Sequence, residues 1–257
     1  MGAWVLPLPS QVAISWGGAA NVDAIDSIDC ITLNCAKTAA PEIWERAIKE
    51  TETSMNRDQH QLCTWYTDGS RLEDGHRGGA AWCPTGIPVK QYLGRLATVH
   101  DGELAGIDCA LQNSTRTDAL ILTDTQAAIQ TVLNIAKGSA PRSGIEKSIM
   151  ERLAARKQQG RRTRIAWVKA HAGVPGNEKV DALAKSAAAF KLQRNGAEVV
   201  TPAGLREAIT ATIKRARDIP GFGRGQRCQG KWSREAVTAY TQLRTNAGPF
   251  RVFLASE

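Results

Sequence analysis

One short segment limits the possible folds more than any other: ALILTD (119–124), which leads directly into the helix-forming segment TQAAIQTVLNIA (125–136). The first segment is apolar at successive positions rather than at alternate ones. This pattern is typical of a parallel strand that is covered by helices on both faces of its sheet. The segment therefore predicts an α/β fold.

The surrounding segments predict the order of strands and helices. Three short apolar segments joined by turns precede ALILTD and indicate an antiparallel meander, and segments with helical periodicity alternate with the later strands. The order βββαβααβα predicts a mixed five-stranded sheet, with three antiparallel strands followed by two parallel ones and helices on both faces. The predicted strands are 62–70, 78–84, 89–96, 119–124 and 164–171.

The chain divides into three predicted parts. Residues 59–190 contain all of these elements and form the predicted domain. Residues 1–58 are predicted to be an N-terminal extension that is weakly structured or partly helical, with one helix opening near Pro41. Residues 191–257 are predicted to be a basic tail with two short helices.

The basic tail carries most of the excess charge. The chain has a formal net charge of +8, and residues 191–257 alone hold 12 Lys and Arg against 5 Asp and Glu. Thr201 is the predicted cap of the first tail helix, and Ser233 that of the second. Such a tail suits a polyanionic ligand, although a solvated tail that binds nothing fits the composition equally well.

Several classes of protein do not fit the sequence. No run of 18 apolar residues occurs, and the first 16 residues lack the basic start and long apolar block of a secretory signal. We therefore predict an intracellular protein of the nucleus or cytoplasm, without membrane contact. The six cysteines form no pair of CxxC motifs, so no zinc site is expected. No oligomer signal is visible, and a monomer is the default expectation.

Four acidic residues lie where a metal site can form. Taken singly, each fits an ordinary role in a turn, at a helix terminus or on a solvated helix face. Because the carboxyl ends of neighbouring strands share one edge of an open α/β sheet, we expect two of them to be close together, with the helical two folded over the same crevice. They are Asp68 at the end of the first strand, Glu103 in the first turn of the first helix, Asp124 ending the fourth strand and Asp181 inside the last helix.

Crowded carboxylates predict bound cations. They repel one another and need positive charge nearby to stay ionised. Ligands that are all oxygens favour hard ions, with Mg²⁺ first and Mn²⁺ as a possible substitute. Two such ions roughly 3.5–4 Å apart can clamp the attacking water and the leaving oxygen of a phosphodiester. The four acids therefore predict a two-metal hydrolytic nuclease.

Four motifs together resemble those of type 1 ribonuclease H. They are TWYTDGS (64–70), DGELAGI (101–107), LILTDTQAAI (120–129) and WVKAHAGVPGNEKVDALAK (167–185), of which the last is the most specific. The resemblance covers roughly half of the chain and implies a ribonuclease H-like fold. It also implies cleavage of the RNA strand of RNA–DNA hybrids, which leaves 3′-hydroxyl and 5′-phosphate ends.

The resemblance implies roles for individual residues. It makes the four acids the metal-binding and catalytic tetrad, and His171 the group that assists proton handling or product departure. Gly69 and Ser70 are expected to approach the hybrid through their backbone, and Gln126 to reach a base edge in the minor groove. For Asn177, a binding role and a structural role in the last helix fit equally well.

Departures from the family pattern and a narrower resemblance complete the prediction. Val99 and His100 stand where some cellular members carry asparagines, so part of the hybrid contact is expected to differ. DGELAGI, TDTQAAI and the later AVTAYTQLRT are similar to the ribonuclease H region of fungal non-LTR retrotransposon reverse transcriptase polyproteins.

The alternatives to a ribonuclease H are an inactive retroelement relic that binds hybrids, a transposase or integrase of the same fold superfamily, and an interaction module whose acids are only structural.

Overall fold

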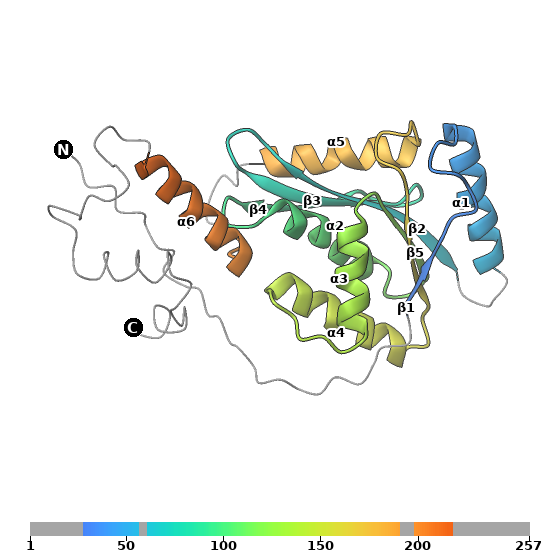
Figure 1. The fold of residues 1–257 in the computed structure, drawn as a ribbon. Helices are drawn as coiled ribbons and strands as arrows, with labels where there is room; N and C mark the ends of the chain where they lie inside the picture. The colour runs from blue at the N-terminus through green and yellow to red at the C-terminus, as the bar shows by residue number, and fades with distance from the viewer. Residues whose placement is uncertain (1–27, 57–60, 191–197, 218–257) are drawn as a thin grey trace, which may run out of the picture. The chain divides into compact units, whose positions relative to one another are not determined.

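The computed structural model describes residues 28–56, 61–190 and 198–217, and these contain a six-stranded mixed sheet (Figure 1). The strands are β1 (Ile28–Ile31), β2 (Leu62–Arg71), β3 (Arg77–Trp82), β4 (Val89–Gly94), β5 (Asp118–Thr123) and β6 (Thr163–Trp167). Their order in the sheet is β1-β6-β5-β2-β3-β4. β2, β3 and β4 form the expected antiparallel meander, and β5 pairs in parallel with both β2 and β6. The predicted mixed α/β sheet is confirmed.

The sheet has one strand more than the five predicted from the sequence. β1 lies at the edge and pairs in parallel with β6, with Ile28 opposite Thr163. Its four residues show no alternation, because Asp29 and Cys30 are both exposed. Backbone pairing with β6 holds this short strand in place. Its own side-chain pattern is too weak to predict it.

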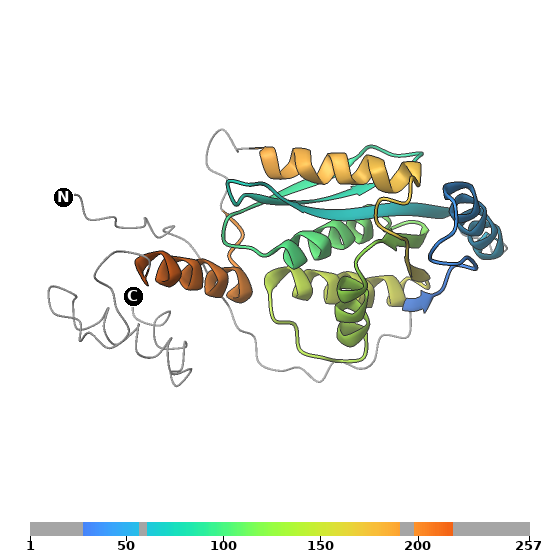
Figure 2. The ribbon, with the colours of Figure 1, turned by 45° about the horizontal axis from the view of Figure 1, so that its top comes forward.

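Helices cover both faces of the sheet, with α2, α3 and α4 on one face and α1 and α5 on the other (Figures 1 and 2). The helices are α1 (Pro41–Met55), α2 (Val99–Asn113), α3 (Gln126–Ala136), α4 (Gly144–Gln158), α5 (Pro175–Ala189) and α6 (Pro202–Arg217). β5 is apolar at successive positions because its side chains are buried on both faces of the sheet. Ile121 packs in the core on the α2 face, whereas Leu120 and Leu122 pack in the core on the α5 face.

Residues 28–56 precede the predicted domain, yet they pack on it. α1 begins at Pro41, close to where the sequence places a helix start. Trp44 and Met55 are only 2% and 1% exposed and belong to the core on the α5 face. Trp44 also meets the ring of Trp167 edge-on, with 5.8 Å between the ring centroids. This segment therefore shares a hydrophobic core with β5 and β6. The division of the chain into residues 1–58, 59–190 and 191–257 stays a prediction.

The chain consists of two compact units, Met1–Ile209 and Thr210–Glu257. The boundary between these two ranges falls within the residues of α6. Within the first unit, the Thr201 hydroxyl caps α6 by accepting the backbone N–H of Gly204 at 3.0 Å. The same hydroxyl donates to the carboxylate of Asp101 at 2.8 Å, in the first turn of α2. The start of α6 is thus tied to the start of α2.

Two expectations concern parts of the chain that the structure does not describe. The second tail helix, with its cap at Ser233, lies outside the described residues, as do residues 1–27. Among the described helices, none is both long enough and apolar enough to cross a membrane.

Candidate active site

Three of the predicted acids meet at the carboxyl edge of the sheet. β2 and β5 are parallel neighbours with Thr67 opposite Thr123, so Asp68 and Asp124 come one position later on adjacent strands. Glu103 joins them from the N-terminal part of α2. Each residue has a carboxylate oxygen within 4.8 Å of the others. The arrangement of the sheet therefore creates the acidic cluster expected from the sequence.

The close contact between α2 and β2 depends on Gly69. A Cβ atom on this residue would lie 2.3 Å from the backbone nitrogen of Glu103 and 2.5 Å from the carbonyl carbon of Gly102. Backbone atoms cannot move aside without moving the helix. Gly69 thus has a packing role that the sequence did not reveal, and its contact with a hybrid stays a prediction. The same holds for Ser70, the next residue of β2, which is 9% exposed.

Gly69→Ala is expected to separate Glu103 from the other two acids. The added methyl group has no space, so overpacking should lower the free energy of unfolding by about 1–3 kcal/mol and reduce nuclease activity. Thermal unfolding and a cleavage assay measure both effects. Gly144→Ala is the matched control, because nothing lies within 4 Å of a Cβ atom there. Equal melting temperature and activity in the two variants would contradict the packing role.

Burial and mutual repulsion make this cluster unfavourable without a counter-charge. Burial raises the pKa of Glu103 to about 9, and the neighbouring charges of Asp68 and Asp124 act in the same direction. Burial likewise raises the pKa of Asp68 to about 7, with further contributions from Asp124 and Asp181. The backbone of Gly69 offers a hydrogen bond to both groups, but this does not offset the repulsion.

The donor atoms of the cluster fit a hard divalent cation. Glu103 Oε2 is buried, and no hydrogen-bond partner for it occurs among the described residues. A buried polar oxygen without a partner is costly unless something unseen satisfies it. Since all three side chains offer oxygen and no cysteine or histidine belongs to this group, Mg²⁺ or Mn²⁺ is the best match.

Asp181, the fourth predicted acid, belongs to a neighbouring group. It lies on α5, and its carboxylate accepts a hydrogen bond from Lys185 Nζ at 2.6 Å. Its oxygen lies within 4.8 Å of ligand atoms of His171 and Glu178, and these three form a second group that could hold a metal ion. The charge of Asp181 still reaches Asp68, whose pKa it helps to raise. The structure thus divides the four predicted acids between two groups of possible metal ligands.

Glu178 is the residue of this second group that sequence reasoning missed. It lies three positions before Asp181 on the same helix, and residues at this spacing are neighbours on a helix surface. That spacing was the available signal. His171 is exposed on the loop between β6 and α5 and has a φ of 51°, which is uncommon for a residue other than glycine. The backbone conformation of this loop therefore sets the direction in which the His171 side chain leaves the chain.

Asn177 links α5 to the acidic cluster. Its side-chain Nδ2 donates to Asp124 Oδ2 at 3.5 Å, and the residue is 3% exposed. Its Oδ1 is buried and has no partner among the described residues. The two roles left open by the sequence are thus compatible, because this side chain contacts a candidate ligand and also belongs to the first turn of α5.

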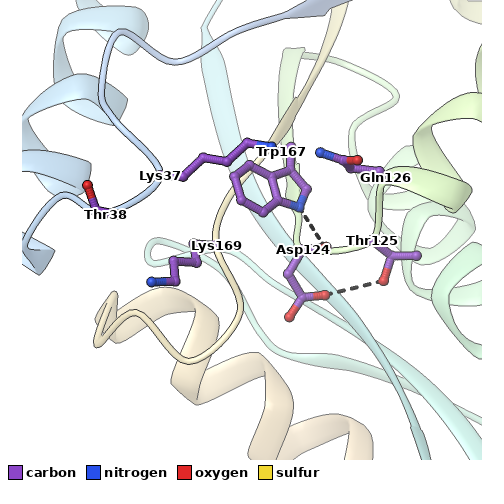
Figure 3. Close-up of a pocket in the computed structure, with 7 residues that line it drawn as sticks. All are labelled: Lys37, Thr38, Asp124, Thr125, Gln126, Trp167 and Lys169. Atoms are coloured by element: carbon purple, nitrogen blue, oxygen red, sulfur yellow. Dashed lines mark hydrogen bonds between the residues drawn. The ribbon is translucent and has the colours of Figure 1, made fainter.

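An open pocket of about 680 Å³ lies beside Asp124 (Figure 3). One of its lining residues is Trp167, whose indole N–H donates to the backbone carbonyl of Asp124 at 2.7 Å. The pocket is lined by Lys37, Thr38, Asp124, Thr125, Gln126, Trp167 and Lys169. Gln126, which the sequence predicts as a substrate contact, is exposed at the start of α3 and lines this pocket.

Sequence reasoning did not identify Lys37 and Thr38 as parts of this pocket. Both precede α1 and lie more than 80 positions before Asp124 in the chain, so no local pattern relates them to it. Only the packing of residues 28–56 on the sheet brings them there.

The chain matches a known protein family. Residues 60–189, about half of the chain, match the family model described as RNase H. The matched stretch contains the Asp68, Glu103 and Asp124 cluster and the loop of His171. It does not contain β1, α1 or α6.

Proposed function

The chain belongs to the RNase H family, and from this premise we propose that it is an endonuclease that hydrolyses the RNA strand of RNA–DNA hybrids. Membership supports a nuclease of the ribonuclease H type. The observation that carries the proposal is the cluster of Asp68, Glu103 and Asp124, whose carboxylate oxygens approach within 4.8 Å at the open edge of the sheet. Cleavage would leave 3′-hydroxyl and 5′-phosphate ends.

In the proposed mechanism, Asp68, Glu103 and Asp124 would hold two Mg²⁺ ions together with Asp181, and Mn²⁺ could substitute. When bound, such ions activate the attacking water and stabilise the leaving oxygen of the phosphodiester. The chain contributes the buried carboxylates of Asp68 and Glu103, whose backbones are held close together by the packing of α2 on β2 at Gly69. His171, exposed beside Asp181, would accept or donate a proton at the edge of the site or assist product departure.

The proposed substrate contacts surround this cluster. Gln126 lines the pocket beside Asp124, and Asn177 donates to the same carboxylate. We propose that both contact the hybrid, together with the backbone of Gly69 and Ser70. An RNA–DNA hybrid differs from other duplexes because only one strand carries 2′-hydroxyls, so recognition should depend mostly on shape and on these groups.

A cleavage assay tests the proposed function. The full chain is incubated with labelled RNA–DNA hybrid, double-stranded RNA or single-stranded RNA, in Mg²⁺ or in EDTA. We expect cutting only of the hybrid and only with the metal. Tight hybrid binding without cutting, in Mg²⁺ and in Mn²⁺, would overturn the proposal and favour the inactive relic.

The origin of the chain is a separate proposal. The segments DGELAGI, TDTQAAI and AVTAYTQLRT support a relation to the ribonuclease H region of fungal non-LTR retrotransposon polyproteins. The intracellular location, the monomeric state and the lack of a zinc site stay predictions from the sequence.

A further inference from the structure

Residues 28–56 lie outside the stretch that matches the family, yet they contribute to the pocket beside Asp124. We propose that Lys37 of this segment, together with Lys169, binds a backbone phosphate of nucleic acid next to the acidic cluster. The inference rests on the proposed function, because the ligand is the nucleic acid that the enzyme is proposed to cut. It makes the N-terminal segment part of the substrate surface.

The two lysines line the pocket from different parts of the chain. Lys37 precedes α1, and Lys169 follows β6. Both side chains are exposed. In Figure 3, Lys37 extends to the Trp167 ring, whereas the ammonium group of Lys169 is turned away from the ring, and Gln126 lies beyond the other edge of the ring. A pocket of about 680 Å³ that opens to solvent can admit a phosphate group still attached to a polymer.

Trp167 holds the Lys37 ammonium group close to the acidic cluster. The Lys37 Nζ lies 5.4 Å from the centroid of the Trp167 ring, a cation–π contact. The same indole donates its N–H to the backbone carbonyl of Asp124. A continuous set of contacts therefore joins Lys37 to a candidate metal ligand. Because the ring attracts the ammonium through its charge, the N–H donors of the lysine stay available for phosphate oxygens.

The segment that carries Lys37 is anchored on both sides of it. Before Lys37, β1 pairs with β6 and Leu33 is 3% exposed in the core. After it, Trp44 is buried. Pro41 packs against the loop of His171, since a Cβ on Gly173 would lie 2.9 Å from its Cγ. Lys37 is thus positioned by packing on either side.

The charges around the pocket favour an anionic ligand. Within residues 28–56, 61–190 and 198–217, no carboxylate lies within ion-pair distance of the Lys37 or Lys169 ammonium group. The acidic cluster repels a phosphodiester backbone, so cations at its border reduce the cost of bringing nucleic acid to it. A lysine that serves only to cover Trp167 would stabilise the fold but would not respond to a polyanion.

Hybrid binding measured as a function of salt concentration distinguishes these roles. The full chain and the variant Lys37→Gln are titrated with labelled RNA–DNA hybrid in EDTA, which prevents cleavage. At 0.1 M salt we expect the variant to bind about five- to tenfold more weakly, with the slope of log K against log salt smaller by about 0.9. Lys37→Arg should keep the affinity and slope of the wild type. Lys49→Gln is the control, because Lys49 is exposed on α1 of the same segment and does not line the pocket.

Each outcome decides the inference. Equal affinity and salt slope in Lys37→Gln and Lys49→Gln overturn it, as does a lower melting temperature with an unchanged slope, which shows a role in folding alone. A wild-type chain that does not bind the hybrid overturns it as well. A reduced slope in Lys37→Gln supports it even if the wild type cuts no hybrid, in which case the proposed nuclease function fails by itself. Normal hybrid cleavage with an unaffected slope rejects only the lysine site.

Discussion

Asp68→Asn is expected to lower the rate of hybrid cleavage by more than about 100-fold, because it removes the charge that faces both acidic groups of the site. Asp124 and Asp181 each raise the pKa of Asp68, which shows that this carboxylate lies within electrostatic reach of both. Its replacement by an amide keeps the shape and deletes the charge that holds cations. The turnover number at saturating hybrid in Mg²⁺ measures the effect.

Loss of activity must be separated from loss of fold. Glu73→Gln is the matched control, because Glu73 is an exposed acid in the turn that follows the same strand, β2. We expect this variant to cut at the wild-type rate. Asp68→Asn should keep its circular dichroism spectrum and bind the hybrid in EDTA, since one repulsive charge is gone. Near wild-type turnover in Asp68→Asn would contradict the assignment of this cluster as the metal site.

Without metal, the protein is expected to lose stability as the pH rises, and Mg²⁺ should restore it. In the unfolded chain, the pKa of Asp and Glu is about 4. In the folded chain, burial and repulsion raise the pKa of Asp68 to about 7 and the pKa of Glu103 to about 9. Between these values the folded state binds more protons than the unfolded state, so the free energy of unfolding falls with increasing pH. The loss is complete for Asp68 above about pH 7 and for Glu103 above about pH 9.

Melting temperatures in EDTA at pH 5.5, 7 and 8.5 test this behaviour. We expect a decrease of several degrees across the series and a larger gain from added Mg²⁺ at pH 8.5 than at pH 5.5, because protons compete with the metal for the same oxygens. The double variant Asp68→Asn/Glu103→Gln should show a smaller decrease and no gain from Mg²⁺. Equal pH dependence in the wild type and the double variant would refute the proposed cause.

Local sequence patterns predicted that Asp68, Glu103 and Asp124 lie close together, as the structure shows. Asp68 and Asp124 were expected together because each follows a strand whose apolar residues identify it, and neighbouring parallel strands end at one edge. Glu103 was expected nearby because the helix that carries it can fold over the same crevice. These inferences need only the order of elements and their periodicity. The same reasoning could not place Asp181 in a different group from the other acids. The position of α5 over the sheet depends on packing between distant residues. At Gly176, for example, an added Cβ would lie 2.3 Å from the Tyr66 ring.

The sequence by itself determined the mixed α/β sheet, the proximity of Asp68, Glu103 and Asp124, and the resemblance to ribonuclease H. Tertiary structure alone decided that β1 and α1 complete the sheet and its core, and that Lys37 lies over Trp167 beside Asp124. The physical reason is the range of the interactions. Periodicity and turns are local properties of a segment, whereas edge pairing, ring contacts and a shared pocket arise only when distant segments exclude water together.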